Sequence, residues 1–228
     1  MDKLILFDWG NILLNSSATS YSIDDAQKDI LRDINPKHNE KLEKLFYSEK
    51  FWTLSERMLE KHIEKYLIYS GCNCSVVDFK KIYLEHYSKV PWFNDIVNLF
   101  RNITMTSGFY TGILSTLCEM DATLLKKYLP LQKCAYRFFS FNLGVQKPDK
   151  RIYDIVETVT GFLPENILFI DDRKENILAA ELRGWNTVWA SGSESQKIAE
   201  ACYSFMGKDY AAEKFSKTLF DAARMRDY

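Results

Sequence analysis

The sequence predicts an α/β protein with a doubly wound parallel sheet and an inserted helical subdomain. In the second half of the chain short apolar runs alternate with segments of helical periodicity, and strands that alternate with helices build parallel sheets. Residues 23–101 instead repeat their apolar side chains at helical spacing, with no strand-like run between them. A chain of 228 residues, 46% of them hydrophobic, can form one large domain with a substantial insertion. We expect a core of residues 1–15 and 102–228 and a helical cap of residues 16–101.

The first strand is expected over residues 4–7, a run of large apolar side chains that ends at Asp8. Gly10 and Asn11 follow and allow the backbone to turn sharply. Open α/β sheets place their ligand chemistry at such carboxyl ends of strands. Asp8 is therefore a candidate nucleophile or metal ligand, although an aspartate at this position also commonly caps a turn.

The segment that follows is expected to form several amphipathic helices. Their apolar side chains recur every three or four residues, for example at Leu59, Ile63, Tyr66 and Leu67. Charges of both signs separate these positions, which is typical of a solvated face. Aromatic side chains in this segment favour a role in its core over substrate contact.

After residue 101 strands and helices alternate. The expected elements are a strand over 111–116, a helix with Leu124 and Leu125 facing inward, an aromatic strand over 138–143, a helix opened by Lys147-Pro148-Asp149, a strand over 167–170, a helix that stops at Gly184, a strand over 187–190 and helical residues from 191 to 228.

Polar side chains gather where these strands end. They are Asp8, Ser115, Asp171 and Asp172, together with Lys147 just before a helix. In a parallel sheet all of them lie along one edge, where carboxylates can hold Mg²⁺ or attack phosphorus. A lysine and a hydroxyl would neutralise the phosphoryl oxygens. The set predicts a phosphate-handling site, although each residue alone also fits a structural role, such as a helix cap or a backbone hydrogen bond.

These residues resemble the four motifs of the haloacid dehalogenase (HAD) superfamily of phosphohydrolases. Phe-Asp8-Trp-Gly-Asn is similar to the first motif, Ile-Leu-Ser115 to the second, Gly-Val-Gln-Lys147-Pro-Asp to the third, and Phe-Ile-Asp171-Asp172 with Asn176 to the fourth. They occur in order across residues 4–190, and the helical block lies where one large subgroup carries its helical cap. The Asp-x-Gly-Asn form of the first motif resembles a sugar-phosphate phosphatase branch.

The resemblance implies a Rossmann-like core and Mg²⁺-dependent hydrolysis of a small phosphorylated metabolite. Sugar phosphates are one candidate class of substrate. Asp8 would be the nucleophile, and Lys147 would act with it in catalysis. Trp9, Gly10, Ser115, Thr116 and Lys147 would contact the substrate. The metal ligands would be Asp8, the backbone carbonyl of Gly10, Asp171 and Asp172, the last as a ligand or as a residue that orients one.

Two positions depart from the family pattern. Most phosphatases of the superfamily carry a general-acid aspartate where this chain has Gly10, and general acid catalysis is typically worth about 10²–10⁴-fold in rate. In the sugar-phosphate phosphatase branch Asn commonly follows the serine of the second motif, where this chain has Thr116. A second hypothesis is therefore a catalytically impaired protein that binds phosphate and Mg²⁺. A third is a 2-haloacid dehalogenase, which the acidic pair at Asp171 disfavours because that chemistry uses no metal.

Composition excludes other classes of function. The 30 basic and 31 acidic residues nearly balance, so we expect no nucleic-acid partner. We expect no membrane span, because no stretch approaches about 20 apolar residues. Five cysteines, an odd number, favour reduced thiols and a cytoplasmic location. Cys72 and Cys74 lack the further ligands of a zinc site.

Overall fold

The computed structural model describes residues 2–35, 43–44, 46–48, 50–129 and 134–209. Its centre is a five-stranded sheet in the order β3-β2-β1-β4-β5, in which every neighbouring pair is parallel. The strands are β1 (Lys3–Phe7), β2 (Phe109–Ser115), β3 (Tyr136–Phe139), β4 (Ile167–Asp171) and β5 (Asn186–Trp189). The predicted α/β class with a parallel sheet is confirmed.

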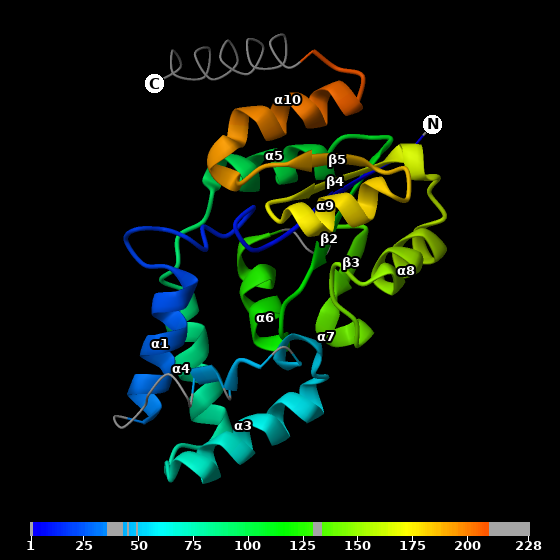
Figure 1. Ribbon diagram of the computed structural model, residues 1–228. Coiled ribbons are helices and arrows are strands. Elements are labelled where there is room, and N and C mark those ends of the chain that lie inside the picture. Colours follow the sequence, from blue (N-terminus) through cyan, green and yellow to red (C-terminus); the bar gives the residue numbers. More distant parts are fainter. Residues whose placement is uncertain (1, 36–42, 45, 49, 130–133, 210–228) are drawn as a thin grey trace, which may run out of the picture.

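Helices cover both faces of the sheet (Figure 1). On one face α5 (Asn94–Thr104) and α10 (Ser195–Phe205) pack in the same apolar cluster as Ile5 and Phe7, and on the other α8 (Lys150–Thr160) and α9 (Lys174–Glu181) pack in the cluster of Leu4 and Leu6. Because successive strand residues point to opposite faces, the continuous apolar run of β1 supplies both clusters. This central, doubly covered strand carries Asp8 at its end.

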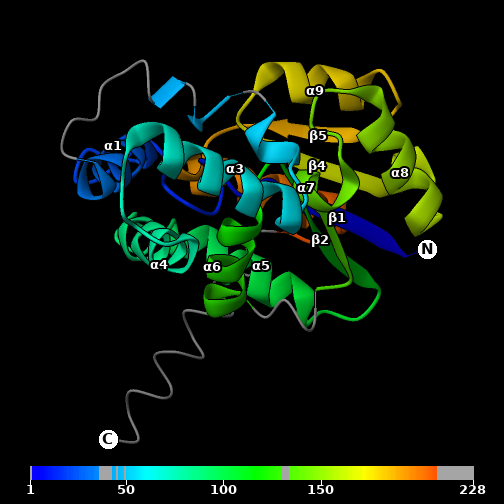
Figure 2. The ribbon, with the colours of Figure 1, turned by 90° about the horizontal axis from the view of Figure 1, so that it is seen from below.

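A second group of helices lies apart from the sheet, on the side where the chain leaves β1 (Figures 1 and 2). It contains α1 (Ile23–Ile34), α3 (Glu56–Ser70) and α4 (Val76–Tyr87), with α1 beside α4. The short 3₁₀ helix η1 (Phe51–Thr53) contacts α7 (Ser140–Leu143), and α4 contacts α6 (Glu119–Tyr128). We call the helices α1, α3 and α4 with η1 the cap.

Helix α5 packs on β2 and α10 rather than on the cap. Its ring of Phe100 meets that of Phe7 edge to face, with 5.3 Å between the centroids. The domain boundary expected between residues 101 and 102 falls within this helix, so we propose to draw it before Asn94. An amphipathic helix has the same sequence pattern whichever partner it covers.

The prediction of a strand over residues 138–143 was wrong for its second half. β3 ends at Phe139, and Ser140–Leu143 forms the single-turn helix α7, which ends at Gly144 with φ +66°. The buried Ser140 hydroxyl accepts a hydrogen bond from the Leu117 amide and approaches the carbonyl oxygens of Leu117 and Trp52. These tertiary contacts hold the turn, and the sequence pattern does not contain them.

The other predicted elements are present, and some of their bounds differ from the prediction. Leu124 and Leu125 are buried in α6, as predicted. Helix α8 begins at Lys150, two residues after Pro148, the expected first helical position, because the Asp149 side chain caps it by accepting from the Arg151 amide. Helix α10 covers part of the helical segment predicted after residue 191, and its predicted extension over 210–228 lies outside the described residues. Within the described part of the chain, none of the helices has the length and apolarity that crossing a membrane requires.

Candidate active site

Three carboxylates meet at the carboxyl ends of β1 and β4. Asp8 directly follows β1, and its amide donates to the carbonyl of Ile170 at 2.9 Å. Asp171 ends β4 and Asp172 follows it. Because the two strands are parallel neighbours, one carboxylate oxygen from each of Asp8, Asp171 and Asp172 lies within 4.8 Å of the others. The sheet therefore assembles an acidic cluster from residues more than 160 positions apart.

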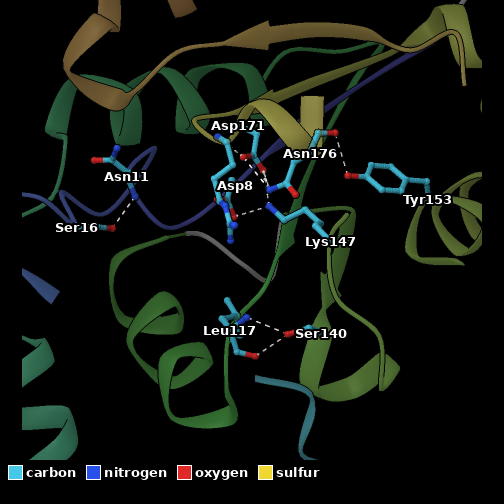
Figure 3. A network of polar contacts seen from close by, with 10 residues as sticks. Asp8, Asn11, Ser16, Leu117, Ser140, Lys147, Tyr153, Asp171 and Asn176 are labelled. Atoms are coloured by element: carbon cyan, nitrogen blue, oxygen red, sulfur yellow. Dashed lines mark hydrogen bonds and ion pairs between the residues drawn. The ribbon is translucent and has the colours of Figure 1, made fainter. Parts of the chain in front are cut away.

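Lys147 lies between two of these carboxylates (Figure 3). Its Nζ is 2.6 Å from Oδ2 of Asp171 and 2.9 Å from Oδ1 of Asp8. The lysine is only 4% exposed, and a charge that deeply buried requires partners of opposite sign. In the described part of the chain no donor makes a well-directed hydrogen bond to Oδ1 of Asp8, in spite of the nearby ammonium group. This oxygen retains capacity for a further ligand.

Asp171 is fixed in place by its neighbours. The Asn176 side-chain amide lies 3.0 Å from both carboxylate oxygens of Asp171, and the Arg173 amide donates to Oδ1 at 2.8 Å. Tyr153 in turn donates to the backbone carbonyl of Asn176 at 3.0 Å (Figure 3). Asp171 is fully buried, so these bonds set the orientation of a carboxylate that water does not reach.

Burial and mutual charge determine the protonation of the site. Burial raises the pKa of Asp171, and the attraction of Lys147 offsets part of this effect. Burial also raises the pKa of Asp172, against the hydrogen bond from Asn11. Burial alone would lower the pKa of Lys147, but Asp171 and Asp8 outweigh it and raise the pKa. Lys147 is therefore charged at neutral pH, and one positive charge faces three acids.

This excess of carboxylates fits a divalent cation. Mg²⁺ takes oxygen ligands at about 2.1 Å in octahedral geometry, which places neighbouring ligand atoms about 3–4 Å apart. One carboxylate oxygen from each of the three residues lies within 4.8 Å of the other two, which is compatible with that spacing. The donor set of Asp8, Asp171 and Asp172 therefore fits the ion that the sequence predicts.

The other predicted site residues lie around this cluster. Ser115 ends β2, which neighbours β1 on the side away from β4, so Asp8 lies between Ser115 and Asp171 in strand order. Ser115 is buried and Thr116 half-buried, and among the described residues neither side chain is hydrogen-bonded to Asp8 or Lys147. They share the sheet edge with the carboxylates.

Trp9 and Gly10 connect the site to the cap. The Trp9 ring is buried and stacks on Tyr87 of α4, with 6.4 Å between the centroids and 15° between the planes. Gly10 is half-buried. Because Trp9 follows Asp8 directly, the position of the cap is linked through this stack to the residue beside the candidate nucleophile.

Asn11 and Ser16 were not predicted as site residues. Asn11 has φ +56°, its side-chain amide donates to Oδ2 of Asp172 at 3.0 Å, and its backbone amide donates to Oγ of Ser16 at 2.7 Å. Asn is among the few residues other than glycine that adopt this left-handed conformation readily. The Gly-Asn pair predicts a turn, but the partners of its side chain depend on the fold.

Comparison with known proteins gives structural matches alone. No family model and no curated protein sequence matches the chain. A solved structure of a predicted HAD-like family hydrolase from Porphyromonas gingivalis matches with a TM-score of 0.64 and 20% identity, over 84% of this chain and 92% of that one. A HAD family enzyme from Bacteroides thetaiotaomicron, solved in complex with magnesium and inorganic phosphate, matches with a TM-score of 0.65 and 16% identity, over 84% and 96%.

A third match is a 2-haloacid dehalogenase from Pseudomonas syringae pv. Tomato, with a TM-score of 0.63 and 18% identity over 83% of this chain and 86% of that one. Each match has a probability of 1.00. At these identities the comparisons establish the fold. The chain has the fold of the HAD-like hydrolases, a Rossmann-like core with flanking helices.

Proposed function

We propose that the protein belongs to the HAD superfamily and is a Mg²⁺-dependent phosphatase of a small phosphorylated metabolite, with sugar phosphates as the first class to test. The observation that carries the proposal is the buried Lys147 between Asp8 and Asp171 in a cluster of three carboxylates. A magnesium–phosphate complex of a protein with the same fold supports it. The odd number of cysteines, all five of them unpaired, supports a cytoplasmic location.

Asp8, Asp171 and Asp172 would hold the metal, with the backbone carbonyl of Gly10. When bound, Mg²⁺ supplies Lewis-acid stabilisation of charge on the phosphoryl oxygens. Lys147 orients Asp8, because its ammonium lies 2.9 Å from Oδ1. The hydrogen bonds from Asn176 and from the Arg173 amide fix the orientation of the Asp171 carboxylate.

In the proposed reaction a carboxylate oxygen of Asp8 attacks phosphorus and the bond to the leaving oxygen breaks. Water then hydrolyses the aspartyl phosphate, which returns Asp8 and releases inorganic phosphate. Such a covalent intermediate divides one difficult displacement into two easier ones. Ser115, Thr116 and Lys147 would hydrogen-bond the phosphoryl oxygens, and Trp9 and Gly10 would contact the substrate on the cap side.

Hydrolysis of para-nitrophenyl phosphate tests this function, because its leaving group needs no general acid. The parent protein and Asp8→Asn are compared with Mg²⁺ and with a chelator. The proposal predicts Mg²⁺-dependent turnover by the parent that Asp8→Asn loses. Equal turnover by the variant would refute the role of Asp8.

The absence of a side chain at Gly10 supports a second candidate, a protein that binds phosphate and Mg²⁺ without turnover. Binding of inorganic phosphate by clean, metal-loaded protein that hydrolyses no ester would favour it. The dehalogenase hypothesis, to which one structural match belongs, predicts turnover of a 2-haloacid in the chelator. The acidic cluster favours metal-dependent chemistry over it.

A further inference from the structure

The leaving oxygen of a phosphate ester needs a hydrogen-bond donor when the leaving group is poor, because it develops negative charge as its bond to phosphorus breaks. Gly10, two residues after Asp8, has no side chain to supply one. The inference that follows rests on the proposed phosphatase function. Another group of this chain lies where a side chain at position 10 would point.

That group is the hydroxyl of Ser16. A Cβ built on Gly10 would meet Oγ of Ser16 at 3.5 Å, an ordinary van der Waals contact and the one neighbour within 4 Å among the described residues. The hydroxyl therefore faces the space into which a side chain at position 10 would project. Ser16 itself is half-buried.

The hydroxyl of Ser16 accepts a short hydrogen bond, and its own proton has a distant acceptor. Oγ accepts from the Asn11 amide at 2.7 Å, and the positive φ of Asn11 accompanies this turn (Figure 3). The acceptor for its own proton is the Leu14 carbonyl at 3.5 Å, the outer limit of a hydrogen bond. A hydroxyl that accepts a short hydrogen bond donates more strongly to a third group.

Ser16 also lies at the junction of the core and the cap. The two segments that join them are bonded to each other, since the Asn15 amide donates to the Pro91 carbonyl at 2.8 Å and the Phe93 amide donates to the Leu13 carbonyl at 2.9 Å. The Ile23 amide, at the start of α1, donates to the Ser16 carbonyl at 3.0 Å. These bonds hold Ser16 between the end of β1 and the start of the cap.

We propose that the Ser16 hydroxyl donates a hydrogen bond to the bridging oxygen of the substrate and takes the place of the carboxyl that position 10 lacks. The bond between phosphorus and this oxygen breaks with its electron pair left on the oxygen. The oxygen takes its proton from water, and the hydroxide left behind is consumed when the aspartyl phosphate is hydrolysed.

The test is the dependence of the rate on the leaving group. Ser16→Ala, the parent and the control Ser17→Ala are compared on para-substituted phenyl phosphates, from nitro to methoxy, with Mg²⁺. Ser17 is the neighbouring exposed serine, whose hydroxyl donates to Oδ1 of Asn11 at 3.1 Å. Loss of one hydrogen bond to a charged oxygen predicts that Ser16→Ala lowers kcat/KM for the methoxy ester roughly tenfold or more. The nitro ester stays within about twofold, since it needs no donor.

A purely structural role for Ser16 would lower the rates of all esters by the same factor, and that result would overturn the inference. So would a Ser17→Ala profile as steep as that of Ser16→Ala. If the parent hydrolyses none of the esters, the proposed function fails first, so the two failures are distinguishable.

Substitution at position 10 supplies an independent test. The clearance of 3.5 Å admits a Cβ, so Gly10→Asp adds a carboxyl on the side of Ser16. If both groups serve the same oxygen, Ser16→Ala costs less activity on the methoxy ester in the Gly10→Asp background than in the parent. Equal losses in the two backgrounds would show that Ser16 does not act on the leaving oxygen.

Discussion

Replacing Lys147 by methionine removes the positive charge that lies between Asp8 and Asp171 while keeping most of the side-chain volume. The lysine is 4% exposed and its Nζ lies 2.6 Å from Asp171 and 2.9 Å from Asp8. Removing one partner of such a buried pair typically costs about 3–5 kcal/mol, because the remaining charge has no compensation. For a chain of this length that corresponds to a fall in Tm of about 6–20 °C.

The assay is thermal and urea unfolding in a chelator, so that no divalent cation replaces the lost ammonium group. Lys80→Met is the matched control. Its Nζ lies 2.9 Å from Glu60 and 3.7 Å from Glu119, but its side chain is 23% exposed, and such pairs contribute up to about 1 kcal/mol. We expect the Lys147→Met deficit to shrink at lower pH, because burial raises the pKa of Asp171 and a protonated Asp171 needs no partner. A Tm for Lys147→Met no lower than that of Lys80→Met would refute the buried charge balance.

Two further predictions concern metal and pH. Mg²⁺ at about a hundred times its Kd should stabilise the parent by about 2.7 kcal/mol and raise its Tm. Asp171→Asn should abolish this rise in Tm when Mg²⁺ is titrated. An equal rise in both proteins would contradict the metal site. Burial raises the pKa of Asp121, whose carboxylate accepts from Tyr83 of the cap at 2.8 Å, from 3.8 to about 6. Because the fold favours the protonated form, this group should add about 3 kcal/mol to the free energy of unfolding as pH falls from well above 6 to well below 4. Asp121→Asn should remove that increment in urea unfolding, and an unchanged pH profile would contradict it.

Much of the fold could be predicted from local pattern. The apolar runs that end at Asp8 and Asp171 predict buried strands, and both form central strands of the sheet. Parallel strands place their ends at one edge, which is why residues far apart in the sequence could be assigned to one site. The residues of the carboxylate cluster and Lys147 were all on that predicted edge.

The parts that could not be predicted depend on tertiary contacts. The turn at Ser140 is held by the Leu117 amide and the Trp52 carbonyl, which are distant in sequence. The roles of Asn11 and Ser16 depend on a backbone conformation, φ +56° at Asn11, that a turn pattern permits but does not require. The affiliation of α5 depends on which surface its apolar face covers.

The stereochemical course at phosphorus tests the central claim most directly. A para-nitrophenyl phosphorothioate, made chiral by labelling one of its two non-bridging oxygens with ¹⁸O, is hydrolysed by the parent protein with Mg²⁺ in water labelled with ¹⁷O, and the configuration of the released thiophosphate is determined. Attack by Asp8 followed by attack of water inverts the centre twice, so the account predicts net retention. Net inversion would show a single displacement by water and would contradict Asp8 as the nucleophile.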